Sequence, residues 1–248
     1  MSMQEKTVII TGAGRGLGAA FALALAPLGC RLILCARQEA SLAPVTAAVM
    51  ARGGRKPEMV ALDLADPESI RSATAVISSV TDRVDVLINN GAMWLESRET
   101  PYGEAEVLNV INAAVSGTFL LVQALRPLME ASEGPDVLTI GSVSGLANAA
   151  LQSVSVPFYA AKRGQIALAE GLRQEYRGSR FRSLLINPPY LEDAMPGESS
   201  WEDSGARAKG AGATSRDVVE AALYALSRPR HLSLTMDLDA DAGGIFGR

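Results

Sequence analysis

Histidine and cysteine are the scarcest reactive residues of the chain. His231 is the only histidine among 248 residues, which excludes a metal site built from several imidazoles and a Ser-His-Asp triad. The two cysteines, Cys30 and Cys35, stand five positions apart at the ends of an apolar run, so in a strand they point to opposite faces. We therefore expect two buried structural thiols that do not pair with each other.

Positive charge is also in short supply. Lysine and arginine number 23 against 27 acidic residues, which gives a net charge of −4 and a pI near 5.2. With no basic stripe in the chain, we exclude a general binder of nucleic acid or of anionic membranes. The polar residues 1–6 run directly into an apolar segment, and we find no apolar run of membrane-spanning length. We expect a cytoplasmic protein without a signal peptide.

Apolar residues are plentiful and regularly arranged. They make up 48% of the chain against 20% charged residues, enough to bury the core of one α/β domain spanning residues 1–248. Uniformly apolar strands that alternate with helices predict a doubly wound, mostly parallel seven-stranded sheet covered on both faces. We expect strands at 7–10, 31–35, 58–62, 84–88, 137–140, 182–186 and 232–236. We expect helices over 19–26, 39–51, from Pro67 with Asp66 as N-cap, and over 104–130, 157–177 and 215–227.

Ligands of such sheets bind at the carboxyl ends of the strands, where the winding reverses. One rim of the predicted sheet therefore collects residues 12–18, 36–37, 63–64, 89–92, 141–145 and 187–193. Residues 189–214 are rich in Gly, Ser, Glu and Ala and have no apolar periodicity. This segment is either a mobile loop over the site or a passive surface loop.

Residues 11–18, Thr-Gly-Ala-Gly-Arg-Gly-Leu-Gly, join the first strand to the first helix. Glycines at 12, 16 and 18 permit a tight turn, let a diphosphate approach the main chain and let the helix pack close to the strand. The amino end of the helix offers N–H groups and partial positive charge to a phosphate. The stretch predicts a dinucleotide site, with a tight turn that holds no ligand as the alternative.

The second strand ends without the carboxylate that would bind the ribose hydroxyls of NAD. That position holds Ala36, followed by Arg37, and Arg15 projects from the glycine turn toward the same end. Two guanidinium groups near a 2′-phosphate favour NADP(H) over NAD(H), unless both are solvated surface charges. Asp63 after the third strand either accepts from the adenine amino group or caps a helix.

Together these motifs resemble the short-chain dehydrogenase/reductase family over nearly the whole chain. The resemblance implies one Rossmann domain, interconversion of alcohols and carbonyls with NAD(P)(H), and a homodimer or homotetramer. Its carriers are residues 11–18, Asp63-Leu64, Asn89-Asn90-Gly91-Ala92, Ser142, Lys162 and Asn187-Pro188. The implied cofactor contacts are Gly12, Arg15, Gly16, Leu17, Gly18, Arg37, Asp63, Leu64, Asn89, Gly91, Lys162 and Pro188.

The catalytic motif of this family departs from its usual pattern here. Its members use a tyrosine acid/base four residues before the lysine, and that position holds Phe158, which cannot donate a proton. A slip of the helix start after Pro157 would bring the neighbouring Tyr159 opposite Ser142; alternatively Tyr159 aligns directly and Arg163 replaces the lysine. The expected catalytic set is Ser142, Tyr159 and Lys162.

Other positions depart as well. Ala114 stands where the family has a helix asparagine, Pro189 replaces a glycine, and Glu192-Asp193 stands where a threonine often meets the cofactor amide. Two functions therefore stay open. One is an NADP(H)-dependent oxidoreductase acting on a small apolar carbonyl or alcohol. The other is a nucleotide-binding protein with impaired hydride chemistry, acting as a sensor or partner subunit.

Overall fold

One parallel sheet of seven strands organises the chain. The computed structural model describes residues 3–147, 149–150 and 154–245. The strand order is β3-β2-β1-β4-β5-β6-β9, and all six pairings are parallel. The winding reverses between β1 and β4, so the predicted doubly wound sheet is confirmed. The strands are β1 (Thr7–Thr11), β2 (Arg31–Ala36), β3 (Glu58–Ala61), β4 (Val86–Asn89), β5 (Asp136–Ile140), β6 (Arg182–Asn187) and β9 (Thr235–Asp237).

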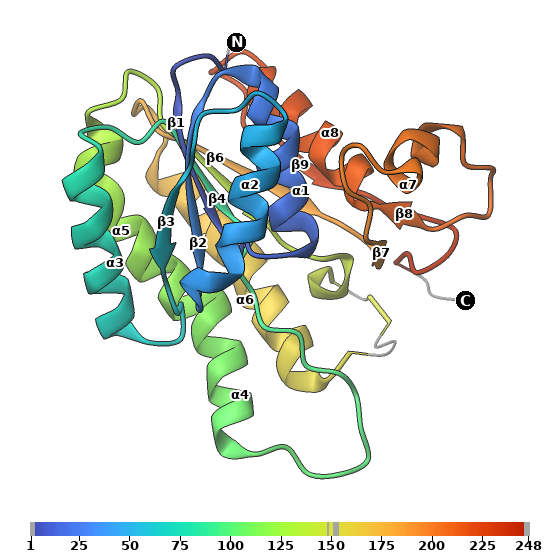
Figure 1. Ribbon diagram of the computed structural model, residues 1–248. Coiled ribbons are helices and arrows are strands. Elements are labelled where there is room, and N and C mark those ends of the chain that lie inside the picture. The colour runs from blue at the N-terminus through green and yellow to red at the C-terminus, as the bar shows by residue number, and fades with distance from the viewer. Residues whose placement is uncertain (1–2, 148, 151–153, 246–248) are drawn as a thin grey trace.

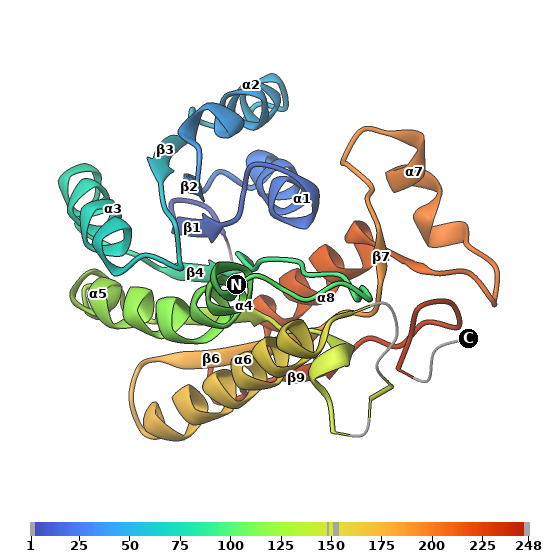
Figure 2. The same ribbon diagram turned by 90° about the horizontal axis from the view of Figure 1, so that it is seen from below.

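Helices cover both faces of this sheet (Figures 1 and 2). Strand residues alternate between two cores: Ile10, Leu34 and Ile88 belong to one, and Ile9 and Leu87 belong to the other. Because both faces are covered, the strands are apolar throughout. The first core contains α1 (Gly16–Leu25), α2 (Ala43–Ala51) and α8 (Ser215–Ser227); the second contains α3 (Pro67–Val80), α5 (Thr118–Glu130) and the end of α6 (Val156–Glu175).

The two cysteines lie in opposite cores, as expected. Cys30 packs in the first core and Cys35 in the second, and both are free thiols. Burial raises the pKa of Cys30 to about 11 and that of Cys35 to about 12. Thiols that ionise so reluctantly are structural rather than reactive.

The helical run expected over residues 104–130 is interrupted. It comprises α4 (Glu104–Ile111), a π-helical turn (Asn112–Gly117) and α5. At Gly117 the run passes so close to the end of the β3–α3 connection that a Cβ there would overlap the carbonyl oxygen of Leu64. A π-helical turn is often found at functional sites, and this one lies beside the rim.

The same run corrects an expectation drawn from the sequence. Residues Glu104–Glu130 form a helix long and apolar enough to cross a membrane by length and composition, with a mean hydropathy of 1.6 over its most apolar window. The α5 part packs Leu121, Leu125 and Met129 into the second core against α3. A core helix of a doubly wound domain passes the same length test, because its buried face is apolar.

The segment 189–214 contains short regular elements rather than a plain loop. β7 (Leu191–Glu192) pairs in parallel with β8 (Ala213–Thr214), and α7 (Ser199–Glu202) lies between them. Figure 2 shows this segment projecting beyond α8, away from α3 and α5. The mobility expected for it stays a prediction.

Candidate active site

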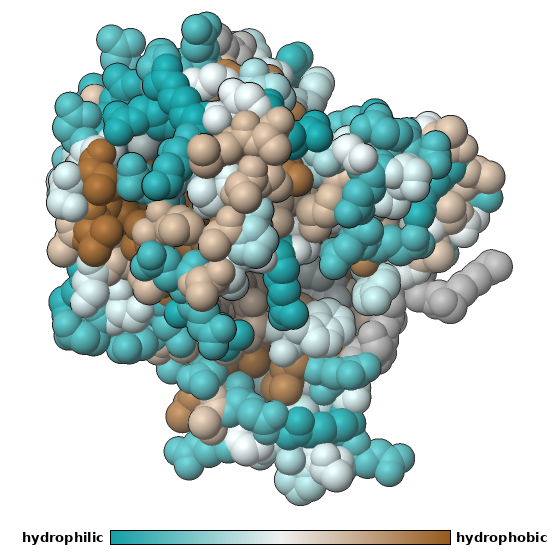
Figure 3. Space-filling model, in the orientation of Figure 1, coloured by the Kyte–Doolittle hydropathy of each residue, from teal (hydrophilic) through white to brown (hydrophobic). Residues whose placement is uncertain are grey.

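A cleft of about 660 Å³ lies along the carboxyl ends of β1, β2, β3 and β4. It spans the point where the winding of the sheet reverses, which is where doubly wound folds bind ligands. In the space-filling view the surface is hollowed at this level, below the body of the sheet (Figure 3). Predicted cofactor residues on its lining are Gly12, Arg15, Arg37, Asp63, Leu64 and Gly91.

The glycine turn forms one wall of the cleft. Gly12 and Gly16 have φ angles of +66° and +52°, in the left-handed region that favours glycine. A Cβ on Gly18 would overlap the carbonyl oxygen of Gly12, so α1 begins directly against the turn. The N-cap residue Arg15 makes no side-chain capping hydrogen bond, and the first turn has no acidic residue. The amino end of α1 is therefore open to an anion.

The end of β4 ties this turn in place. Asn90 Nδ2 donates to the carbonyl oxygens of Thr11 and Gly12 at 3.0 and 3.3 Å. Thr11 Oγ1 in turn accepts from the main-chain N–H of Gly91 at 2.8 Å. A Cβ on Gly12 would lie 2.9 Å from Gly91 Cα, and a Cβ on Gly91 would lie 3.1 Å from Thr11 Oγ1, so neither position has room for a side chain. These contacts join the end of β4 to the glycine turn.

Two arginines line the cleft, one in the glycine turn and one after β2. Arg15 and Arg37 line it and are exposed, and neither guanidinium group forms an ion pair or hydrogen bond with the residues that the structure describes. Ser41 and Gln38, which sequence reasoning missed, join this lining; Ser41 Oγ donates to the Gln38 carbonyl oxygen at 2.6 Å. Their signal in the sequence was only their nearness to the end of β2. Free guanidinium groups beside a hydroxyl suit a phosphate monoester.

Asp63 does not cap α3, and its predicted contact with adenine stays a prediction. It lines the cleft, and its Oδ1 accepts from the N–H of Ala65 at 2.9 Å, which closes the turn before α3. The N-cap of α3 is instead Asp66, as predicted, because its side chain accepts from Glu68 N at 2.9 Å. The carboxylate of Asp63 is thus held in place at the cleft by its own turn.

Lys162 is buried beneath the other end of the rim. Its Nζ donates to the carbonyl oxygen of Ile140 at 3.2 Å and to Gln165 Oε1 at 2.9 Å. Burial lowers the pKa of Lys162 to about 8. Sequence reasoning missed Gln165, although a polar residue on the buried face of a helix, three positions after a lysine, was a usable signal. The ammonium group of Lys162 is thus held by hydrogen bonds to Ile140 and Gln165.

Phe158, not Tyr159, shares the helix face of Lys162. The Phe158 ring centre lies 5.9 Å from Lys162 Nζ and 4.8 Å from the Trp94 ring, in an edge-to-face arrangement. Helix α6 begins regularly, because the Ser155 side chain accepts from Phe158 N at 3.2 Å. Positions 158 and 162 are therefore one turn apart on one face.

Tyr159 and Ser142 are not joined. Tyr159 is half-buried in a cluster that includes Val110 and Ala114, and its hydroxyl bonds to none of the described residues. Ser142 caps a 3₁₀ turn, Val143–Gly145, where its Oγ accepts from Ser144 N at 3.1 Å. The structure thus places the three expected catalytic residues near one end of the sheet without a hydrogen bond between Ser142 and Tyr159.

Two further predicted cofactor residues lie in the framework of the rim. Asn89 is buried at the end of β4, and its amide has no hydrogen-bond partner among the residues described. Pro188 accepts from Val143 N at 2.9 Å through its carbonyl oxygen, which joins the end of β6 to the Ser142 turn. The helix asparagine of the family is replaced by buried Ala114 inside the π-helical turn.

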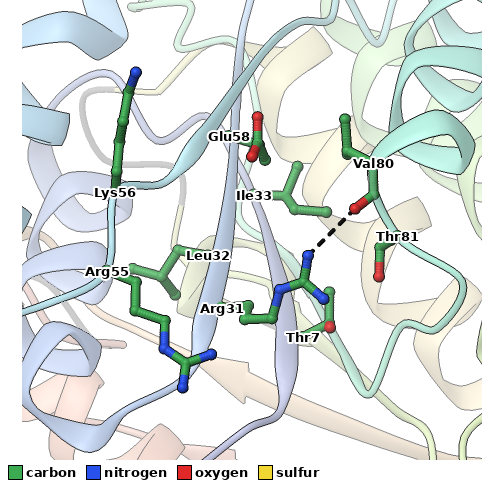
Figure 4. A pocket seen from close by; sticks show the side chains of 9 residues that line it. All are labelled: Thr7, Arg31, Leu32, Ile33, Arg55, Lys56, Glu58, Val80 and Thr81. Atoms are coloured by element: carbon green, nitrogen blue, oxygen red, sulfur yellow. Dashed lines mark hydrogen bonds between the residues drawn. The ribbon is translucent and has the colours of Figure 1, made fainter.

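A second, smaller pocket lies at the amino ends of β1 and β2, away from this rim (Figure 4). Its volume of about 70 Å³ is lined by three cationic side chains and Glu58. Arg31 Nη2 donates to the Val80 carbonyl oxygen at 3.3 Å, and Arg55 pairs with Glu5. A space of this size holds a few water molecules and no larger ligand. Within the described ranges, we find no cluster of three metal-ligating side chains.

The amino-acid sequence is similar to those of known oxidoreductases. A family model for short chain dehydrogenases matches residues 6–203. An uncharacterized oxidoreductase of Staphylococcus saprophyticus is 27% identical and matches over 94% of this chain and 96% of its own. The ketoacyl reductase HetN of Nostoc is 29% identical over 77% of this chain and 65% of its own.

Solved structures share the fold at lower identity. A metagenomic short-chain oxidoreductase in complex with NADP has a TM-score of 0.76 at 24% identity, covering 96% of this chain and 97% of its own. The RhlG/NADP complex of Pseudomonas aeruginosa has a TM-score of 0.82 at 21% identity and covers 96% of both chains. Both of those proteins hold NADP.

Proposed function

Because the chain belongs to the short chain dehydrogenase family, we propose that it is an NADP(H)-dependent oxidoreductase that interconverts a carbonyl and an alcohol on a small apolar substrate. The observation that carries this proposal is the open amino end of α1 at the cleft, together with the unpaired guanidinium groups of Arg15 and Arg37 on the cleft lining. The backbone of Gly12, Gly16 and Gly18 fits a diphosphate, since side chains there would fill the approach. The two NADP complexes that share this fold agree with that assignment.

The chain's own residues have distinct roles in this proposal. Bound NADP(H) supplies or accepts the hydride. Ser142 donates a hydrogen bond to the substrate oxygen, where negative charge develops during carbonyl reduction. Tyr159 is the candidate proton donor, and Lys162 anchors the nicotinamide ribose. To donate this proton, the Tyr159 side chain has to rotate so that its hydroxyl approaches Ser142.

Apolar side chains support an apolar substrate. Met93 lines the cleft, and Leu95 and Val154 are buried with Phe158 in one cluster beside it. The segment 189–214 would then border the substrate as part of the same single domain. Exposed Leu108 and Leu120 on the outer faces of α4 and α5 support a homodimer or homotetramer through these helices.

A second function has its own observation. Phe158 holds the position of the missing tyrosine beside Lys162, and Tyr159 packs elsewhere. A site of this form binds the dinucleotide but has no proton donor next to the ammonium. It suits a nucleotide-binding protein that acts as a sensor or partner subunit.

Tyr159→Phe separates the two functions. NADPH consumption is measured over a panel of apolar aldehydes and ketones, and NADPH binding is measured by calorimetry. As an enzyme, the protein should lose turnover by about 10²–10⁴ in this variant while it keeps NADPH affinity. Tyr224→Phe, an exposed tyrosine on α8, is the matched control. Unchanged turnover in Tyr159→Phe would remove this residue from the reaction; NADPH binding without turnover in the wild type would favour the sensor.

A further inference from the structure

A carboxylate lies beside the phosphate-binding end of α1. Asp193 follows β7, and its Oδ1 and Oδ2 are 3.4 and 3.8 Å from the position that a Cβ on Gly16 would occupy. Gly16 is the first residue of α1 and has a left-handed backbone. No described residue forms an ion pair or hydrogen bond with the Asp193 side chain, which is exposed. An unneutralised negative charge therefore faces the turn.

The main chain next to Asp193 is anchored to the body of the fold. The N–H of Ala194 donates to Ser215 Oγ at 3.4 Å, at the start of α8. Two residues further on, the Pro196 carbonyl oxygen accepts from Arg52 Nη1 at 3.1 Å. These two contacts tie the main chain that follows Asp193 to the start of α8 and to Arg52, the residue after α2.

The position of this charge matters because α1 has no anion of its own. The N-cap side chain accepts no hydrogen bond from the first turn of α1, and that turn contains no acidic residue. The partial positive charge and free N–H groups there attract one anion, and Asp193 is the anion that the chain supplies. A dinucleotide places its diphosphate at the same helix end. The carboxylate and the diphosphate then repel each other across a few ångströms.

We propose that Asp193 competes with the cofactor diphosphate for the amino end of α1 and sets the affinity for NADP(H) below the value that the glycine turn would otherwise allow. The inference rests on the proposed function, because it concerns the cofactor of that site. Two phosphate charges within a few ångströms of a carboxylate, in a cleft open to water, weaken binding by about tenfold. Salt screens such a repulsion, so its effect falls as ionic strength rises.

The test compares Asp193→Asn, which keeps the shape and removes the charge, with Asp203→Asn. Asp203 is an exposed carboxylate of the same segment, after α7. NADPH dissociation constants are measured by calorimetry at low and high salt, with adenosine 2′-monophosphate as a probe that lacks the diphosphate. Asp193→Asn should bind NADPH about tenfold more tightly at low salt, with a smaller gain at high salt. Its affinity for the monophosphate should equal that of the wild type, and Asp203→Asn should match the wild type for both.

Three outcomes would overturn the proposal. If the wild type binds NADPH and Asp193→Asn binds it equally or more weakly, Asp193 does not oppose the cofactor, and the proposed function still stands. If the monophosphate gains as much affinity as NADPH, the effect belongs to overall charge rather than to the diphosphate. If neither protein binds NADPH or NADH, both this inference and the proposed function fail.

Discussion

The ammonium group of Lys162 lies 5.9 Å from the centre of the Phe158 ring, one turn earlier on α6. Phenylalanine differs from tyrosine by a single oxygen, and the family resemblance predicts a tyrosine at this position. Trp94 contacts the same ring and fixes its orientation. At position 158, therefore, the chain has a ring without the hydroxyl that the resemblance predicts.

Phe158→Tyr tests whether that hydroxyl alone limits the chemistry. The new phenol would lie beside a buried ammonium, which favours its ionised form and makes it a usable acid/base. We expect carbonyl reduction with NADPH to rise by about 10² or more. Initial rates of NADPH consumption over a panel of apolar carbonyls measure the gain.

The control for this substitution is the double variant that combines Phe158→Tyr with Tyr159→Phe. If position 158 is the productive one, the double variant keeps the gain. Calorimetry shows whether NADPH binding is intact in each protein. If the variant binds NADPH normally and gains no activity, the missing hydroxyl at position 158 is not the only feature that limits the reaction.

The architecture was predictable because its signals are local. The glycines at 12, 16 and 18 stand between an apolar run and a helix-forming stretch, and the Asp66-Pro67 pair predicts the start of α3 from neighbouring residues alone. Parallel strands buried on both faces have few polar positions, so their apolar runs are unmistakable. Rim residues such as Arg37 and Asp63 then follow from strand ends.

Other features depend on contacts between distant segments. The π-helical turn forms where Gly117 meets the main chain of Leu64, a contact absent from either local sequence. Capping by Ser155 fixes where α6 begins, and the start of α6 determines whether Phe158 or Tyr159 lies one turn before Lys162. Asp193 lies near Gly16 although 177 positions separate the two residues in the chain. The pattern of apolar residues within one segment cannot predict contacts with a distant segment.

Arg37→Ala tests the preference for NADP(H). Arg37 lines the cleft without a partner among the described residues, so its guanidinium is free to bind a 2′-phosphate. Loss of a charge-assisted hydrogen bond should weaken NADPH by roughly 10–100-fold. NADH has no 2′-phosphate, so its affinity should change little. Dissociation constants for both cofactors are measured by calorimetry.

Arg71→Ala is the matched control, because Arg71 is exposed on α3 and pairs with Glu68 away from the cleft lining. This variant should bind both cofactors as the wild type does. Equal losses for NADPH and NADH in Arg37→Ala would contradict the 2′-phosphate role. Such a result would indicate that Arg37 acts on the shared part of the cofactor or on the fold.

Lys162 makes the stability of the fold depend on pH in a definite direction. Burial lowers the pKa of Lys162 from 10.5 to about 8. Below pH 8 the lysine is protonated in both the folded and the unfolded state, and the folded state bears the full cost of a buried ammonium. Between pH 8 and 10.5 only the unfolded chain keeps the proton, so this cost falls as pH rises. At about 1.4 kcal/mol per unit of pKa shift, the cost below pH 8 is about 3 kcal/mol.

Lys162→Met isolates this contribution. Cys30 and Cys35, whose pKa values are raised by burial, reduce stability at high pH in both proteins, so the difference between variant and wild type cancels their effect. Free energies of unfolding from urea titrations at pH 7, 8, 9 and 10 should show that the variant's advantage over the wild type shrinks, or its deficit grows, steadily above pH 8. Loss of the hydrogen bonds to Ile140 and Gln165 shifts the difference equally at every pH, so its slope is the diagnostic. Exposed Lys209 gives the control Lys209→Met. If the stability difference stayed constant from pH 7 to 10, Lys162 would have the same pKa in the folded and unfolded states. That result would contradict the lowered pKa expected for a buried lysine.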